Sequence, residues 1–182
     1  HVAREERGAA EGAAAGAMER GVSMKISFRN YEKEDVLLLK DMWNEVIEDG
    51  MSFPQIEPYD TESFSKVLEE ETAVVCMCVD GEIAGYYTLH PNIIGRCSHV
   101  ANISYLIGKK FRGRHLGRHL VADSVRRARQ EGFRGIQFNG VGAWNKAAIH
   151  LYQDAGFKTL ATIPGGFRLK DGTYSDMYIM YL

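Results

Sequence analysis

The residues best suited to binding chemistry form a cluster of cations between a predicted strand and a predicted helix. The stretch 109–119 (KKFRGRHLGRH) carries five lysine and arginine side chains and no carboxylate, in a chain whose 22 basic and 24 acidic residues give a net charge of −2. Cations at a helix N-terminus are unfavourable by a few tenths of a kcal/mol to ~1 kcal/mol each. Gly113 and Gly117 would let a ligand approach the backbone N–H groups. The stretch therefore predicts a phosphate site, with a solvated basic helix start as the alternative.

Other ligand-binding patterns fit the chain less well. The ATP-type loop G-x-x-x-x-G-K-S/T is absent. Gly140 and Gly142 follow a predicted strand like the start of a dinucleotide fingerprint, but Asn145 stands where the third glycine belongs. His115 and His119 have the i, i+4 spacing of metal ligands, without a glutamate between them or a third ligand in view, so we expect no metal.

The elements that position this stretch alternate between strand and helix periodicity. We expect helices at 34–47, 60–70, about 116–128 and 145–155, and strands at 25–29, 72–79, 83–89, 99–107, 135–141, 157–163 and 174–182. Asp80-Gly81 predicts a tight hairpin, Gly156 a left-handed helix end, and Pro164-Gly165-Gly166 part of a loop before the last strand. This order predicts an α/β fold with a single mixed, mostly antiparallel sheet flanked by helices.

The composition separates a short leader from one domain. Residues 1–23 are rich in Ala, Gly, Glu and Arg, contain no aromatic residue and lack the apolar region of a secretory signal. We expect a leader, native or added, that is disordered or loosely helical. Met24 then marks the natural start, and a single domain covers residues 24–182.

The composition also excludes several classes of protein. With 45% hydrophobic and 10% aromatic residues the chain is typical of globular proteins, and its net charge of −2 disfavours a polybasic nucleic-acid binder. No apolar run approaches the ~18 residues needed to cross a bilayer. Three cysteines, Cys76, Cys78 and Cys97, make a poor disulfide framework and predict buried, reduced thiols in a cytoplasmic protein.

Two motifs together resemble a known family. Arg112-Gly113-Arg114-His115-Leu116-Gly117 is similar to the pyrophosphate loop Q/R-x-x-G-x-G/A of the GNAT N-acetyltransferases, with His115 in place of the middle glycine. Asn145, Ala148, Leu151-Tyr152 and Gly156-Phe157 resemble the family's second motif. The resemblance covers about residues 25–182 and is densest over 99–157. It implies a GNAT-like acyltransferase fold and acetyl-CoA as co-substrate.

The resemblance also implies where acetyl-CoA lies. The sheet would open between strands 99–107 and 135–141, and the pantetheine arm would bond to backbone there. Tyr152 would be the general acid for the departing thiolate, unless it is only a core tyrosine. At His115 we expect right-handed backbone with the side chain in solvent. The implied cofactor-binding residues are Leu106, Ile107, Arg112, Gly113, Arg114, His115, Leu116, Gly117, Arg118 and Asn145.

The acceptor side of the site is less defined by the sequence. Asn102 and Asn139 are candidates to hold the polar groups of the substrate. The pair Asn139 and Asn145, six residues apart, resembles the pattern of the branch of the family that acetylates proline analogues and small imino or amino acids. The acceptor pocket would be lined by the segments 51–59 and 164–170. The general base is left open among His99, Glu45, Glu48, Glu57 and a water relay.

The expected activity is transfer of an acetyl group from acetyl-CoA to the amine of a small molecule or amino acid, by direct attack in a ternary complex. The alternative is a non-catalytic sensor that binds acyl-CoA without turnover. Nucleic-acid binding through the basic stretch is a third hypothesis, which the net charge disfavours. We expect no membrane partner, and the sequence leaves open whether the protein is a monomer or a homodimer.

Overall fold

The computed structural model describes residues 23–182, so the predicted leader lies, except for Ser23, outside the described residues. The predicted order of helices and strands is confirmed. The helices are α1 (Val36–Asp49), α2 (Thr61–Glu70), α3 (Gly117–Gln130) and α4 (Lys146–Asp154). The strands are β1 (Ile26–Asn30), β2 (Ala73–Val79), β3 (Glu82–Pro91), β4 (Val100–Ile107), β5 (Gly135–Gly142), β6 (Lys158–Arg168) and β7 (Tyr174–Tyr181).

The strands form one mixed sheet that opens in its middle. Their order is β1-β2-β3-β4-β5-β7-β6, and every neighbouring pair is antiparallel except β4 and β5. The parallel pair joins only Val100 to Gly135 and Ala101 to Ile136. From Asn102 onward, β4 has no strand partner on this side among the described residues. The two strands therefore separate after their first residues, which leaves backbone groups free to bind a ligand.

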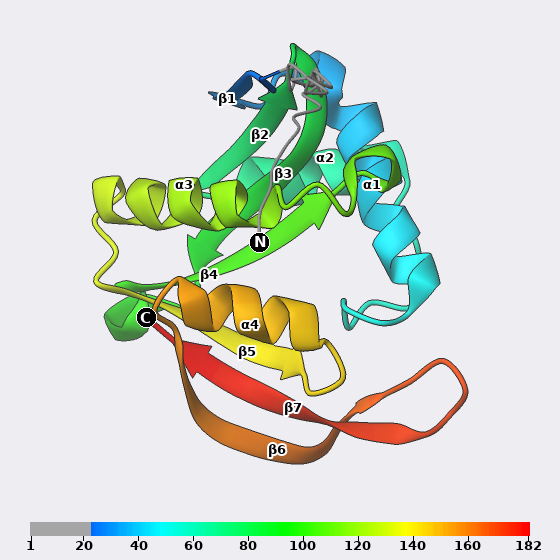
Figure 1. Cartoon of the computed structure of the whole chain (residues 1–182), viewed down its shortest axis with the longest axis vertical. Coiled ribbons are helices and arrows are strands. Elements are labelled where there is room, and N and C mark those ends of the chain that lie inside the picture. The colour runs from blue at the N-terminus through cyan, green and yellow to red at the C-terminus, as the bar shows by residue number, and fades with distance from the viewer. Residues whose placement is uncertain (1–22) are drawn as a thin grey trace, which may run out of the picture.

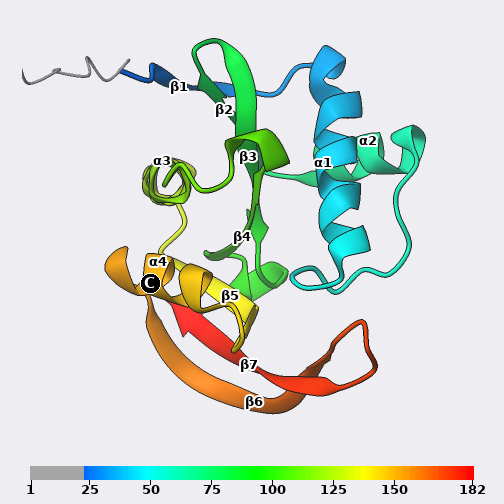
Figure 2. The same ribbon diagram turned by 45° about the vertical axis from the view of Figure 1, so that its right-hand side comes forward.

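Helices cover both faces of the sheet. α3 and α4 lie on one face and α1 and α2 on the other (Figures 1 and 2). The first face packs on Leu120 and Val121 of α3, and the second on Leu39 and Trp43 of α1. β2, between the two layers, is buried at every position. Its unbroken apolar sequence follows from this burial, since alternate side chains enter opposite cores.

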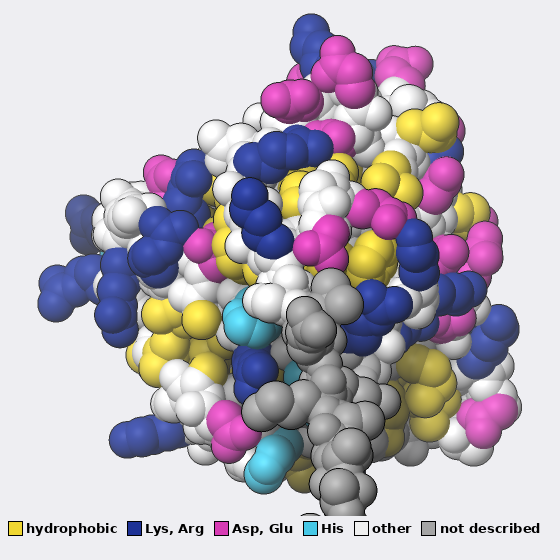
Figure 3. All heavy atoms as spheres, turned by 45° about the horizontal axis from the view of Figure 1, so that its top comes forward, with side chains coloured by type: hydrophobic (Ala, Val, Ile, Leu, Met, Phe, Trp, Pro, Cys, Tyr) yellow, Lys and Arg dark blue, Asp and Glu magenta, His cyan; other side chains and the backbone are white. Residues whose placement is uncertain are grey.

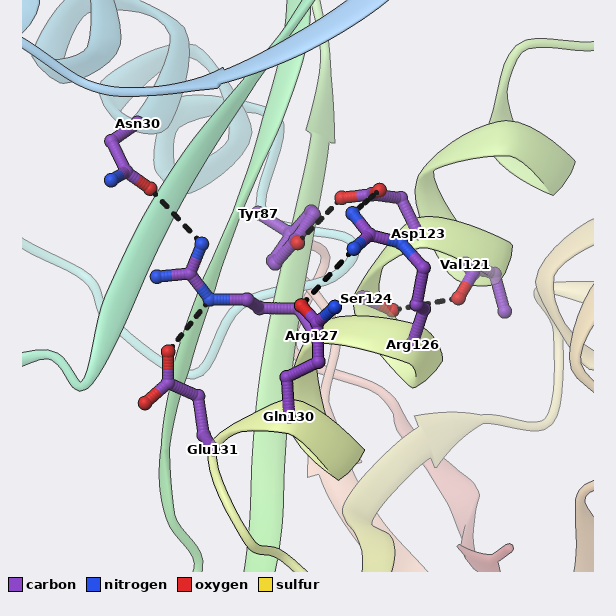
Figure 4. A network of polar contacts seen from close by, with 9 residues as sticks. All are labelled: Asn30, Tyr87, Val121, Asp123, Ser124, Arg126, Arg127, Gln130 and Glu131. Carbon is purple, nitrogen blue, oxygen red and sulfur yellow. Dashed lines mark hydrogen bonds and ion pairs between the residues drawn. The ribbon is translucent and has the colours of Figure 1, made fainter.

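Helix α3 is fixed to the sheet by polar contacts as well as by its apolar stripe. The hydroxyl of Tyr87 on β3 donates to Asp123 Oδ2 at 2.7 Å, and Arg126 pairs with the same carboxylate (Figure 4). Tyr105 Oη lies 2.7 Å from Ser124 Oγ. Burial and the Asp123 carboxylate raise the pKa of Tyr87, so its hydroxyl remains a donor. These contacts fix the middle of α3 relative to β3 and β4.

Two predictions are wrong, one about a loop and one about the burial of a cysteine. Pro164, Gly165 and Gly166 lie within β6, which continues to Arg168 through a register shift between Ile163 and Phe167. Because β6 is an edge strand, the missing N–H of Pro164 costs no central ladder bond. Cys97 is exposed in the short 3-10 turn Gly95–Cys97, whereas Cys76 and Cys78 are buried as predicted.

Over residues 23–182, none of the helices is long and apolar enough to cross a membrane.

Candidate active site

A cavity of about 940 Å³ lies where β4 and β5 separate. One wall is β4 from Asn102 to Ile107, and another is β5 from Phe138 to Gly142. α4 contributes Tyr152, and the segment 51–55 after α1 also lines the cavity. The cavity therefore combines residues from both halves of the sheet.

The loop before α3 presents a series of free backbone donors. None of the N–H groups from Gly113 to Arg118 donates a hydrogen bond to another described residue. Gly113 has φ +77° and His115 has φ +57°, and alternation of left-handed with other residues exposes successive N–H groups. Arg112, just before this run, and Gly117, within it, both line the cavity. The loop therefore has the chemistry of an anion site at the cavity.

The backbone at His115 differs from our expectation. We expected a right-handed conformation, but φ is +57° and the side chain is exposed. Left-handed backbone costs a residue other than glycine about 1–2 kcal/mol. This is the position at which the family pattern has glycine, so the loop keeps the glycine-like conformation although the residue has changed.

Some basic side chains of this segment have polar partners within the protein, and others form no ion pair. Lys110 pairs with Glu82 at 2.8 Å, and Arg112 donates from Nε to the Ile107 carbonyl at 3.1 Å. Arg114 lies over the ring of buried Phe111, 5.3 Å from its centroid. Arg114 and Arg118 form no ion pair among residues 23–182. Basic and acidic side chains are interspersed over most of the face in Figure 3, and Arg114 and Arg118 are exposed cations beside the free N–H groups.

Close packing surrounds the end of the cavity that lies beside the loop before α3. Leu106 and Ile107 line it, while their backbone pairs with β3 on the opposite edge. Leu116 is buried in the core and does not line the cavity. A Cβ at Gly117 would lie 2.9 Å from Leu151 Cδ2, too close for a side chain without a shift. A larger residue at position 117 would therefore require the Leu151 side chain to move.

Asn145 has a structural role in addition to lining the cavity. Its side chain caps α4, since Oδ1 accepts a hydrogen bond from the Ala148 N–H at 3.1 Å. Such a cap stabilises a helix by about 1 kcal/mol. Its amide Nδ2 makes no hydrogen bond to a described residue and can donate to a ligand.

Tyr152 lies in an aromatic cluster at the wall of the cavity. Its ring centroid is 4.6 Å from Phe138 and 5.8 Å from Phe157. The hydroxyl has no hydrogen-bond partner among the described residues, and the side chain lines the cavity. Burial raises the pKa of Tyr152 to about 12, so the phenol stays protonated at neutral pH. The residue thus packs as a core tyrosine and still offers a proton to the cavity.

A cluster of neutral amides forms the opposite end of the cavity. Asn92 Oδ1 accepts from Asn102 Nδ2 at 3.0 Å and from Asn139 Nδ2 at 2.6 Å. Gln137 donates to Asn139 Oδ1 at 3.0 Å. Asn92, Asn102 and Asn139 all line the cavity. The two asparagines suggested by the sequence are thus brought together by a third that the sequence did not suggest.

The residues suggested as general bases lie outside this arrangement. His99 precedes β4 rather than lying on it, is exposed, and has Nδ1 3.1 Å from the Arg96 carbonyl oxygen. The carboxylates Glu45, Glu48 and Glu57 do not line the cavity either. Of the two segments expected to line the acceptor pocket, the cavity is reached by Met51–Gln55 and by Phe167.

Sequence reasoning missed His90, which lines the cavity at the end of β3. The predicted strand ends at Leu89, two residues before the observed end of β3 at Pro91. In the observed register His90 is opposite Asn102. Extending the strand by one residue would have paired these two polar side chains on one face.

The fold and the cavity together define a class of protein: a mixed sheet that opens beside a loop of free N–H groups and leaves one cavity between its two halves. The sequence matches the Acetyltransferase (GNAT) family over residues 39–157, and the chain belongs to that family. Acetyl-CoA is the acetyl donor of the family. The free N–H groups, the unpaired arginines and the open sheet edge fit a pyrophosphate and its pantetheine arm.

Individual relatives agree with this assignment. The chain is 34% identical over 98 residues to N-acetyltransferase aca1 of Schizosaccharomyces pombe, a match of 53% of this chain and 47% of the relative. The match thus spans about half the length of that curated relative. A GCN5-related N-acetyltransferase from Kribbella flavida superimposes with a TM-score of 0.80 at 28% identity, covering 86% of this chain and 96% of that one.

A second solved structure supports the fold alone. The phosphinothricin acetyltransferase of Sinorhizobium meliloti, in complex with AcCoA, gives a TM-score of 0.81 at 18% identity. It covers 87% of this chain and 88% of that chain.

Proposed function

We propose that the protein transfers the acetyl group of acetyl-CoA to the amine of a small molecule, by direct attack in a ternary complex. One observation carries this proposal: a single cavity is lined by the anion-binding loop through Arg112 and Gly117 and by the amide cluster through Asn102 and Asn139. Donor and acceptor can therefore occupy the site together, which places the amine near the thioester without a covalent enzyme intermediate.

At the donor end, the N–H groups from Gly113 to Arg118 would hold the pyrophosphate, assisted by Arg112, Arg114 and Arg118. Backbone groups of Leu106 and Ile107 would bond to the pantetheine arm where β4 has no strand partner. Asn145 Nδ2 would donate to the same arm. A backbone N–H of β4 would polarise the thioester oxygen as negative charge develops on it.

Tyr152 would donate its proton to the thiolate that leaves. A phenol with its pKa raised to about 12 is a weak acid, and a thiol has a pKa of about 8.5 in water. The apolar wall around Tyr152 disfavours a free thiolate by the same desolvation that keeps the phenol neutral. Tyr152 therefore assists departure of the thiolate by a hydrogen bond, and it does not account for the whole rate of acetyl transfer.

At the acceptor end, the chemistry favours a small amino or imino acid with an uncharged side chain. The amide cluster leaves Asn102 Oδ1 and Asn92 Nδ2 without partners among the described residues, one to accept from an amine and one to donate to a carboxylate. Phe53, Phe167 and Met177 give apolar walls.

Release of free thiol from acetyl-CoA, measured with a panel of amines, tests this proposal. We expect turnover with small neutral amino or imino acids and much less with polyamines, lysine side chains or peptides. CoA binding without thiol release from any amine would favour the sensor. A cytoplasmic location and a homodimer stay predictions, the second checked by sedimentation.

A further inference from the structure

His90 and Glu71 form a polar pair at the acceptor end of the cavity. His90 lies on the face of β3 that also carries Asn92, and in the antiparallel register it is opposite Asn102. Its Nδ1 lies 2.9 Å from Glu71 Oε2. The His90 side chain is 39% exposed and the Glu71 side chain only 10% exposed. The histidine thus faces the cavity while its carboxylate partner is withdrawn behind it.

The carboxylate of Glu71 orients the imidazole. Glu71 ends α2, and His90 is the one hydrogen-bond partner of its side chain within residues 23–182. A carboxylate this buried is stable only when it is paired, and it accepts the proton of Nδ1–H. That bond fixes the tautomer and leaves the lone pair on Nε2. Nε2 has no hydrogen-bond partner among the described residues, so it is available to a ligand in the cavity.

We propose that His90 is the general base that deprotonates the acceptor amine through Nε2, with Glu71 as its positioning residue. This inference rests on the proposed function. It replaces the candidates suggested by the sequence, since His90 is the histidine that lines the cavity and adjoins the amides expected to hold the acceptor.

The proton balance of the step is simple. The ammonium N–H bond of the acceptor breaks and a bond from that proton to Nε2 forms, giving an imidazolium stabilised by the Glu71 carboxylate. The freed lone pair forms the C–N bond to the thioester carbon, and the C–S bond breaks. Tyr152 donates a proton to the sulfur, and the phenolate is reprotonated by the second proton that the acylated nitrogen loses. The imidazolium then loses its proton to solvent, so one proton is released per acetyl group.

The surroundings of His90 determine the pH at which it can act. Glu71 raises the pKa of His90 above its ordinary value, and burial lowers it by less. The adjacent strands contribute the neutral Asn92 and Asn102, and Tyr152 across the cavity stays protonated. The remaining charged lining residues, Asp49 and Arg112, lie 3.8 Å from each other. The fraction of His90 in its neutral, basic form therefore increases as the pH rises through this raised pKa.

Two variants test the base with different readouts. H90Q should lower kcat/KM for the acceptor about 10²-fold near neutral pH. The loss should shrink as pH approaches the pKa of the acceptor amine, because free amine then needs no base. Calorimetry should show unchanged CoA affinity. The matched control is H150Q, because His150 is 80% exposed on α4 and does not line the cavity.

E71Q keeps a hydrogen-bond acceptor beside His90 and removes the charge. NMR titration of the His90 ring in the free protein should give a pKa above about 6.5 for the wild type and a lower value in E71Q. The acidic limb of the kcat/KM profile should move to lower pH by the same amount. The measurements on E71Q test the proposal even if H90Q folds poorly.

Three results would contradict the proposal, and each overturns a different part of it. A wild type that binds CoA but acetylates no amine overturns the proposed function and this inference with it. An active wild type with H90Q equally active, or equally impaired at every pH, overturns the base alone. A His90 pKa that does not respond to E71Q overturns the role of Glu71.

Discussion

The two ends of the cavity are built from different parts of the polypeptide. The donor end uses backbone: free N–H groups from Gly113 to Arg118 and glycine at Gly117, where a side chain would meet Leu151. The acceptor end uses side chains: the amides of Asn92 and Asn102, and the imidazole of His90. Backbone binding suits a ligand common to a whole family, whereas side chains can change from one protein to another to suit different acceptors.

This difference predicts unequal sensitivity to single substitutions. At the acceptor end and at Tyr152, removal of one polar group should change the rate of the chemical step. At the donor end, removal of one side chain leaves the backbone donors in place and should change affinity only moderately. The following variants test that contrast, beginning with the largest effect.

Y152F should lower kcat by about 10²-fold while CoA affinity and the unfolding temperature stay close to those of the wild type. The phenylalanine keeps the packing on Phe138 and Phe157 but removes the proton donor. Steady-state rates and calorimetry measure the two quantities. Y174F, on a tyrosine that is 69% exposed on β7, is the control. Turnover at the wild-type rate in folded Y152F would leave Tyr152 with a packing role only.

R114Q and R118Q should each weaken CoA binding about 5-fold, corresponding to ~1 kcal/mol for an exposed charge-assisted contact, and the loss should diminish at high salt. Acceptor KM should not change. R129Q serves as control, because Arg129 is also exposed but lies in the last turn of α3. Equal effects of all three substitutions would mean that only net charge matters and would contradict a local phosphate site.

H115G should stabilise the fold by about 0.5–1 kcal/mol, because glycine adopts φ +57° without steric strain. The unfolding temperature should rise by roughly 2–4 °C, with CoA binding retained. H115A removes the same side chain but keeps the strain, and it should give no such gain. If H115A stabilises as much as H115G, the left-handed backbone is not the cause.

Local patterns predicted the order of helices and strands, whereas the roles of the residues at the donor end stay predictions. The sequence 112–117 carries its own loop geometry, and the apolar periodicity of each helix and strand reports its burial. The acceptor end was predicted only in part, because its polar groups come from segments far apart in sequence. Asn92 and His90 have no local motif, and they become functional candidates only when strand register brings them beside Asn102 and Asn139. Left-handed backbone at His115 was missed because histidine seldom adopts it.

Calorimetric titration with CoA and, separately, with pantetheine tests most directly whether the N–H groups of residues 113–118 hold the pyrophosphate. Pantetheine retains the arm that would lie between β4 and β5 but has no phosphates. The account predicts one CoA bound per chain, binding that weakens with salt, and pantetheine binding weaker by at least an order of magnitude. No heat with CoA in folded protein, or equal affinity for pantetheine, would contradict it.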